Sequence, residues 1–311
     1  MSGTVIVGYD QSEASEPALM FAAREADLRG ATLVVFHGYH FTRRAAALVP
    51  PAALQQVYED AGLRIADIGV KHARARFPDL TVQSGAEAGV HARMLAEAGE
   101  RADLIVVGNR GRGGFTGLLL GSVSMRTLGA ARCPVVVVRG GEREPRGRVV
   151  AGLDVDDPAA ETVLDFAFAE ASLRRADLVA VYAWDQDAPL ILDVALGTAG
   201  IGEAAQTIVA ACDERLSALV HKVVARHPGV TASHQAATAS PAGLLVAESQ
   251  HADLLVVGAR RHIHDHPGMR IGPVAAAVLH HAACPVAVVP TTAAGTGTTA
   301  LRPGPEENRL T

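Results

Sequence analysis

A glycine-rich segment, GNRGRGGFTGLLLGSVS, is the part of the sequence best suited to hold an anion. Gly108 and Gly111 open it, and Gly121 and Ser122 close it where a helix should begin. Glycine lets a ligand approach the backbone closely, and free amides at a helix start attract phosphate. Ser122 is also a good N-cap residue. A phosphate cradle and an ordinary glycine loop before a capped helix explain this pattern equally well, and the Gly-Lys-Ser/Thr of a P-loop is missing.

Three histidines that could bind a metal alternate in the sequence HIHDHP: His262, His264 and His266. In an extended segment alternate residues share a side, so three imidazoles could meet one metal ion. The only carboxylate that could support them is Asp265, which would point the other way. A solvated polar loop is the better interpretation, and we predict no metal ligands in the chain.

The elements that must position these residues occur twice. ADLIVVG at 102–108 returns as ADLLVVG at 252–258, and CPVVVV returns as CPVAVV. The opening strands VIVGYD and VVAGLD end at Asp10 and Asp154. Markers that recur in the same order at nearly constant spacing indicate two copies of one domain.

Each copy alternates short β-branched runs with amphipathic helical stretches. Runs such as LIVV and VVVV are too continuous for a sheet with one wet face, and they fit parallel strands covered by helices on both sides. The predicted class is therefore α/β, with two tandem doubly wound parallel five-stranded sheets of Rossmann-like type. The expected strands are 4–8, 32–37, 80–84, 103–108 and 134–138 in copy one, and 148–153, 177–184, 230–234, 253–258 and 285–289 in copy two. The helical stretches expected in copy one are 14–26, 54–76, 90–99 and 122–131.

The predicted division of the chain follows from composition. The boundary falls in GGEREPRG, which is rich in glycine and charge, and the C-terminal stretch is small, polar and without periodicity. The two copies should pack on each other as a pseudo-dimer through their exposed fifth-strand edges. The predicted parts are domain one, 1–140, a linker, 141–147, domain two, 148–290, and a flexible tail, 291–311.

Composition excludes several classes of function. The 28 basic and 33 acidic side chains give a net charge of −5, which argues against a polybasic nucleic-acid or membrane binder. Aromatic residues make up 4%, too few for a base-stacking platform. No secretory signal or membrane span is expected, so the predicted location is cytoplasmic. Cys133, Cys212 and Cys284 cannot form a disulfide framework and are expected to be small buried side chains.

The spacing Gly108-x2-Gly111-x9-Gly121-Ser122 resembles the ATP-binding signature of universal stress proteins. ADLIVVG before it, SVSMRTLGAARCPVVVV after it and the opening VIVGYDQSEASEPAL also resemble that family. The resemblance covers both copies, about residues 1–290. It implies an adenine nucleotide alpha hydrolase-like fold and an ATP-binding stress-response protein, with Mg²⁺ near the phosphates. It also implies that two chains could associate as a homodimer.

The resemblance implies roles for residues of copy one. Asp10 would meet the adenine and ribose end of the nucleotide, although a carboxylate there could also serve only a turn or an N-cap. Gly38 would contact adenine through its backbone. The residues that would contact ribose and triphosphate are Gly108, Gly111, Gly121, Ser122 and Val123.

Copy two departs from this pattern in GARRHIHDHPGMRIGPVAA. Gly258 and Gly272 survive, but Arg261 replaces the second glycine and Pro273 replaces the serine. Proline has no amide or hydroxyl to offer a phosphate, but it suits the first position of a helix. We therefore expect the helix to persist and the phosphate cradle to be weakened.

Other residues of copy two could still serve a nucleotide. The nucleoside end is kept by Asp154 and Ala183. Arg260, Arg261 and Arg270 could recover part of the lost phosphate binding as charges.

Three functions are consistent with these features. The preferred one is a nucleotide-dependent sensor or regulator that is not an efficient enzyme. A slow ATPase or nucleotidyl-transferring enzyme on the same cradle is the second, but Asp10 is the only carboxylate expected nearby to act as a base or metal ligand. The third is a ligand-free protein that docks partners.

Overall fold

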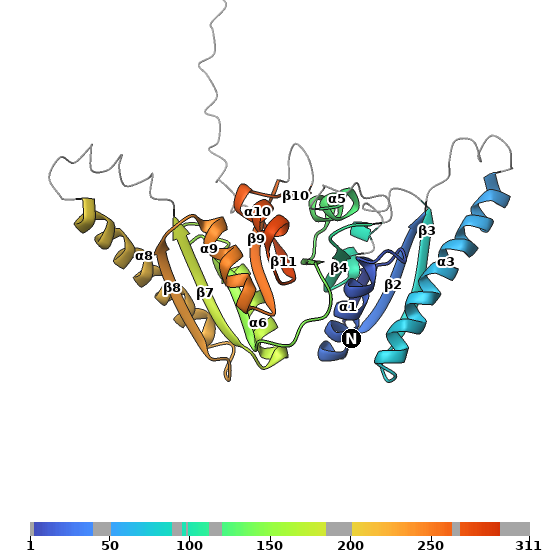
Figure 1. Cartoon of the computed structure of the whole chain (residues 1–311), viewed down its shortest axis with the longest axis horizontal. Coiled ribbons are helices and arrows are strands. Elements are labelled where there is room, and N and C mark those ends of the chain that lie inside the picture. The colour runs from blue at the N-terminus through green and yellow to red at the C-terminus, as the bar shows by residue number, and fades with distance from the viewer. Residues whose placement is uncertain are drawn as a thin grey trace, which may run out of the picture.

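The structure is a computed structural model of the chain. It describes residues 3–39, 51–88, 95–97, 99–111, 120–184, 201–262 and 268–292. Figure 1 shows the two domain copies on either side of a central seam.

Copy one forms a parallel sheet with the strand order β3-β2-β1-β4-β5. Its first strand, β1, pairs with β2 on one side and β4 on the other, so the chain reverses direction across the sheet at β1. The α/β doubly wound class predicted from the sequence is confirmed. The strands of copy one are β1 (Thr4–Gly8), β2 (Thr32–Tyr39), β3 (Val82–Ala88), β4 (Leu104–Gly108) and β5 (Val135–Val138), and its helices are α1 (Ser15–Arg29), α3 (Pro51–Arg76), η1 (Gly99–Arg101) and α5 (Ser122–Ala130).

Copy two repeats the arrangement with the order β11-β9-β6-β7-β8. A short additional strand, β10, pairs antiparallel with β9. The strands of copy two are β6 (Arg148–Gly152), β7 (Asp177–Trp184), β8 (Ala232–Thr238), β9 (Leu254–His262), β10 (Gly268–Arg270) and β11 (Val286–Thr292), and its helices are α6 (Ala160–Arg174), α8 (Ile201–Val224), α9 (Pro241–Glu248), η2 (Ser249–His251) and α10 (Pro273–His281).

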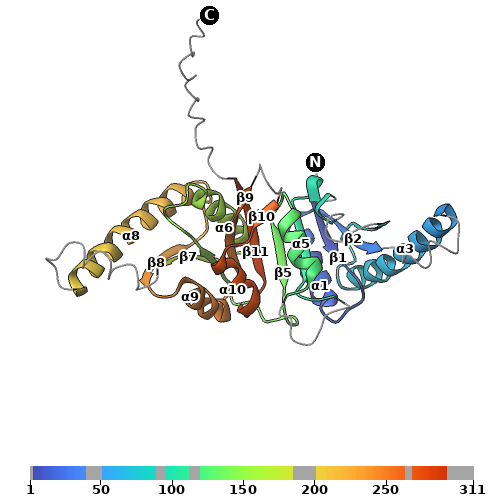
Figure 2. The same cartoon turned by 90° about the horizontal axis from the view of Figure 1, so that it is seen from above.

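The two copies join through β5 and β11, which pair antiparallel with Val137 opposite Val286 and Val135 opposite Val288. The fifth-strand edges therefore pack as the sequence predicted. One consequence was not predicted: the two five-stranded sheets become a single continuous sheet of 11 strands, including β10. Figure 2 shows β5 and β11 side by side between the two sets of helices.

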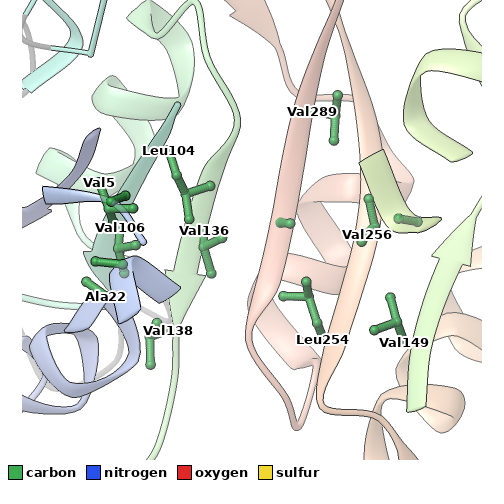
Figure 3. Packing of buried hydrophobic residues seen from close by; sticks show 14 of the residues in the cluster. Val5, Ala22, Leu104, Val106, Val136, Val138, Val149, Leu254, Val256 and Val289 are labelled. Atoms are coloured by element: carbon green, nitrogen blue, oxygen red, sulfur yellow. The ribbon is translucent and has the colours of Figure 1, made fainter. Parts of the chain in front are cut away.

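Side chains of alternate strand residues pack into two hydrophobic layers, one on each face of the sheet. Val5 and Val7 belong to the layer beneath α1, α3, α6 and α8, whereas Ile6 belongs to the layer beneath α5, α9 and α10. This follows from the two-residue period of a strand, which explains why the runs read as continuously apolar. Figure 3 shows Val5, Leu104 and Val136 of copy one and Leu254 and Val256 of copy two, which belong to one of these layers.

Cys133 and Cys284 are buried as predicted, and Cys212 is only partly buried. Burial raises the pKa of the Cys133 thiol to about 11 and that of Cys284 to about 12. Both therefore stay protonated and unreactive near neutral pH.

Several element boundaries differ from the sequence prediction. β9 continues to His262 because β10 and β11 pair with it on both sides. β11 runs through Thr291, where the tail was expected to begin, and Thr291 is buried and donates a hydrogen bond to the Ala259 carbonyl at 3.2 Å. Most of the helix expected over 90–99 lies outside the described residues.

Among the described residues, no helix is both long enough and apolar enough to cross a lipid bilayer.

Candidate functional site

The candidate site of copy one lies at the carboxyl ends of β1 and β4. These strands are neighbours, and the connections that follow them lead to opposite directions in the strand order. Crevices of this kind are where ligands bind in open α/β sheets. Asp10 follows β1, and Gly108 ends β4.

Three predicted residues converge at this point. The Asp10 Oδ1 accepts the Ser12 amide at 3.0 Å, which fixes the carboxylate in the turn after β1. A Cβ placed on Gly111 would lie 3.0 Å from the Asp10 Oδ2 and meet no other atom of the described residues within 4 Å. The Gly121 amide donates to the Asn109 carbonyl at 2.7 Å, which brings the start of α5 back to the end of β4. We call Asp10, Gly108, Gly111 and Gly121 the cradle.

Two further contacts hold α1 and α5 against β4. A Cβ on Gly108 would lie 2.4 Å from the Ala14 carbonyl oxygen, so only glycine leaves room for the backbone at the start of α1. The buried Ser124 hydroxyl donates to the Gly108 carbonyl at 2.7 Å. Gly108 is thus a packing residue as well as a member of the cradle.

The structure corrects one expectation about the loop, that Ser122 is the N-cap of the helix. Gly121, with φ −73° and ψ 153°, is the N-cap of α5, and Ser122 is an exposed residue in the first turn. The glycines with positive φ in the described chain are Gly30, Gly140, Gly147 and Gly229, so the cradle glycines need no left-handed backbone. They matter because they leave space.

The remaining predicted residues of copy one lie on the same elements. Gly38 is in β2 opposite Glu87 of β3. Beside it, His37 Nδ1 hydrogen bonds to the Tyr9 carbonyl at 2.8 Å, which ties β2 to the turn that carries Asp10. Val123 lies in the first turn of α5 and packs on the hydrophobic layer beneath that helix. Residues 112–119 of the glycine loop lie outside the described chain.

In copy two a cavity of about 820 Å³ occupies the corresponding place. It lies at the carboxyl ends of β6 and β7, against Val257–Arg260 within β9 and beside the starts of α9 and α10, and we call it the copy-two cavity. It brings together all four residues predicted for this copy, namely Asp154, Ala183, Gly258 and Gly272. Asp154 repeats the geometry of Asp10, because its Oδ1 accepts the Asp156 amide at 3.1 Å.

Copy two differs from copy one in the segment that corresponds to the glycine loop. β9 continues where β4 stops, and Arg261, the counterpart of Gly111, pairs with Met269 of β10 and Thr292 of β11. The helix persists as predicted, since Gly272 is the N-cap of α10 and Pro273 is its first residue. The backbone at Arg261 is therefore part of the sheet and not of a loop that could wrap a phosphate.

One arginine proposed as a compensating charge is already engaged. Arg260 Nε donates to Asp157 Oδ2 at 2.9 Å. Partial burial alone would raise the pKa of Asp157, but the Ala159 amide and the Arg260 guanidinium outweigh it and hold that pKa below its usual value. The contact uses the Nε–H donor of Arg260, and the Asp157 carboxylate offsets the positive charge of the guanidinium.

Sequence reasoning missed the aromatic wall of the copy-two cavity. Tyr182 and Trp184 both line it, with ring centroids 5.7 Å apart and planes tilted by 30°. Alternation along β7 puts them on one face of the strand and Ala183 on the other. The signal was present, because Trp184 is the single tryptophan of the chain and ends a predicted strand.

Within the described part of the chain, no group of three or more His, Cys, Asp or Glu residues is placed to hold a metal ion. His262 ends β9 opposite Gly268 of β10. His264 and His266 lie outside the described residues, so the histidine triplet remains a sequence observation.

Comparison with known proteins gives the class and then the family. The duplicated Rossmann-like fold matches a solved universal stress protein from Archaeoglobus fulgidus, with a TM-score of 0.65 and 16% identity, over 93% of this chain and 99% of that one. The family model described as "Universal stress protein family" matches residues 1–139 and 145–290. The chain belongs to the universal stress protein family, and stress response is its functional class.

Curated relatives have the same tandem length. A universal stress protein of Mycolicibacterium smegmatis is 34% identical over 302 residues, which cover 92% of this chain and 96% of the relative. A universal stress protein of Mycobacterium tuberculosis is 32% identical over 292 residues, which cover 91% of this chain and 95% of the relative.

Proposed function

We propose that copy one binds ATP in the cradle, with Mg²⁺ on the phosphates, and that the chain is a nucleotide-dependent sensor or regulator of the stress response. The observation that carries this proposal is the convergence of Asp10, Gly111 and the N-terminus of α5 at one switch point. The 3.0 Å approach of the Gly111 Cβ position to Asp10 supports it, because a side chain there would fill the space between loop and carboxylate.

Different residues of the site suit different parts of a nucleotide. The first amides of α5 and the small loop residues suit phosphate oxygens, which accept hydrogen bonds and favour the positive end of a helix. Asp10 is a hydrogen-bond acceptor and suits ribose hydroxyls. Gly38 leaves its backbone accessible at the carboxyl-end half of β2 for a flat base.

Mg²⁺ fits this site as a companion of the nucleotide. It prefers oxygen ligands, keeps several waters and is commonly bound through substrate phosphates with one or two carboxylates. Among the described residues, Asp10 and Ser122 carry side-chain oxygens that could take part. When bound, the ion would neutralise part of the charge of the triphosphate.

The two copies should bind ATP unequally. Copy two lacks the amide and the hydroxyl that Ser122 offers, and the backbone of Arg261 is paired within the sheet. Each charge-assisted hydrogen bond lost is worth about 1.5–3 kcal/mol, so two losses weaken binding by roughly a hundredfold or more. We therefore expect one tightly bound ATP per chain.

Equilibrium dialysis of the full chain with labelled ATP and Mg²⁺, followed by product analysis, tests this function. We expect about one ATP per chain, recovered largely as ATP after a long incubation. Rapid conversion to ADP would favour the enzyme alternative, and no retained nucleotide at millimolar ATP would favour the docking protein. The whole chain is required because the β5–β11 pair and both hydrophobic layers are shared between the copies.

Two further predictions about the chain remain open to test. The cytoplasmic location is one. The homodimer is the other, and it would need a surface other than β5 and β11, since these edges already pair within one chain.

A further inference from the structure

We propose that the copy-two cavity is a second ligand site, which binds an uncharged aromatic nucleoside and rejects a triphosphate. The proposal concerns a different site from the cradle and does not depend on ATP binding by copy one. It rests on the charge, the closed phosphate end, the aromatic wall and the size of the cavity.

The charge of the lining is wrong for a polyphosphate. Among the side chains that the structure describes, the charged ones that line the cavity are Asp154, Asp157 and Arg260. Arg260 is paired with Asp157 at 2.9 Å, which leaves the Asp154 carboxylate as the net charge of these described side chains. A triphosphate would bring further negative charge beside it, whereas a neutral ligand would not.

The part of the site that should surround phosphates is occupied by backbone. Arg260 and Arg261 of β9 pair with Thr291 and Thr292 of β11 on one side and with β10 on the other. Their peptide groups are therefore committed to the sheet, and the first residue of α10, Pro273, has no amide to donate.

The nucleoside end is intact and has an unused donor. The Nε1 of Trp184 is buried and finds no acceptor among the residues that the structure describes. A buried polar group without a partner requires an explanation, and an acceptor on a bound heterocycle would supply one. Tyr182 beside it offers a second aromatic surface, and the anchored Asp154 carboxylate can accept hydrogen bonds from sugar hydroxyls.

The dimensions also fit. The cavity of about 820 Å³ lies within the range of about 300–1,000 Å³ that is usual for small-molecule sites. Apolar side chains from three elements, Val163, Leu245 and Ile271, complete the lining. The same site thus combines an apolar body, an indole donor and the acidic acceptor Asp154, which is the chemistry that recognises a nucleoside.

Trp184 makes the test specific, because it is the only tryptophan in the chain and lines this cavity. We would titrate the full chain with adenosine, AMP and ATP and follow tryptophan emission. We expect a saturable change with adenosine, at a concentration at least tenfold lower than with ATP, and an intermediate result with AMP. No saturable change with adenosine up to millimolar concentration, or equal or tighter binding of ATP, would overturn the proposal.

Two variants show whether the signal comes from the cavity. A Cβ on Gly272 meets no atom of the described residues within 4 Å, so Gly272→Leu adds its side chain at the cavity wall, and we expect it to weaken adenosine binding at least tenfold. The matched control is Gly141→Leu, also in open space but outside the cavity lining, which should bind as the parent does. Unchanged binding in a folded Gly272→Leu, or equal loss in both variants, would contradict the site.

The signal must also be independent of the cradle. A Gly111→Val variant alters copy one only, so the adenosine response of Trp184 should be unchanged in it. Loss of that response would mean that the emission reports on copy one and would overturn the assignment. A failure of ATP binding in copy one would leave the adenosine response intact, so the two proposals fail separately.

Discussion

The three glycines of the cradle have two separate physical roles. At Gly108 the constraint is the Ala14 carbonyl, 2.4 Å from the position of a Cβ. At Gly111 the neighbour is the Asp10 carboxylate at 3.0 Å, and at Gly121 it is the Arg110 Cα at 3.3 Å. A side chain at Gly108 would disturb the packing of the fold, whereas side chains at Gly111 and Gly121 would reduce the space available to a ligand.

Gly108→Ala should lower the free energy of unfolding by about 1–3 kcal/mol, because the methyl group meets backbone that cannot rotate away. The matched change is Gly258→Ala, where the nearest atom is the Val163 Cγ2 at 2.9 Å, part of a side chain that can shift. Chemical denaturation of both variants provides the measurement. An equal cost at both positions would refute the distinction between backbone and side-chain contact.

The sequence predicted which residues gather at the site but not all of the reasons. The glycine spacing indicated Gly111 and Gly121, and the family resemblance added Asp10; residues that follow neighbouring parallel strands then meet at one edge. It could not show that Gly121 caps α5 in place of Ser122, since either residue can occupy an N-cap. Nor could it show the Arg260–Asp157 pair, which joins residues far apart in the chain.

At the scale of elements, the joint between the copies depends on more than the pairing of β5 and β11. Arg139, which follows β5 directly, donates to the Leu279 carbonyl at 2.9 Å and also to the His280 carbonyl. These are carbonyls of the last turn of α10, which have no partner within the helix. Copy one thus caps a helix of copy two.

Arg139→Ala should destabilise the chain by about 1–3 kcal/mol, because partly buried carbonyls lose their donor. Hydrogen exchange should show the loss at the end of α10 first. Arg143→Ala is the control, since the Arg143 contact with the Ala283 carbonyl is exposed. If protection of α10 were the same in Arg139→Ala and the parent, the capping role would be rejected.

The prediction of helices and strands succeeded where the local sequence pattern determines them. It failed where the extent of a strand depends on pairing with strands from elsewhere in the chain. α1, β1 and β7 follow from periodicity and β-branched runs, and β7 begins and ends where predicted. The extension of β9 to His262 depends on β10 and β11, which arrive from later in the chain. The fusion of the two sheets likewise depends on the antiparallel pairing of β5 with β11. The sequence indicated only that these strands have exposed edges.

Across the whole molecule, a buried ring of four charges joins α1 to α6. Arg29 contacts Glu25 of its own helix and Glu170 of the other copy, and Arg174 contacts Glu170 and, across the interface, Glu25. Burial, followed by the Glu25 charge, raises the pKa of Glu170. Burial alone would lower the pKa of Arg174, but the two carboxylates outweigh it and raise that pKa. The ring is symmetric because each copy contributes the same Glu-x3-Arg pair.

Glu170→Gln should cost about 3–5 kcal/mol of unfolding free energy, because it leaves two buried guanidinium groups with one carboxylate between them. The control on the same helix is Glu161→Gln, whose ion pairs with Lys222 and Arg226 are exposed and should matter little. Thermal and denaturant unfolding of both variants is the test. Similar stability in the two would show that the buried ring does not hold the copies together.

The central claim is that copy one binds ATP at the start of α5, and calorimetric titration with Mg²⁺ and ATP tests it most directly in Gly121→Val and Gly272→Val. Both glycines are N-caps with extended backbone, φ −73° and −70°, so neither substitution requires a left-handed conformation. They differ in packing, because a Cβ on Gly121 would lie 3.3 Å from the Arg110 Cα, so the fold of each variant is checked before the titration. We predict that Gly121→Val loses ATP binding by at least a hundredfold, while Gly272→Val binds one ATP as the parent does. Unchanged affinity in a folded Gly121→Val, or the same loss in Gly272→Val, would contradict the account.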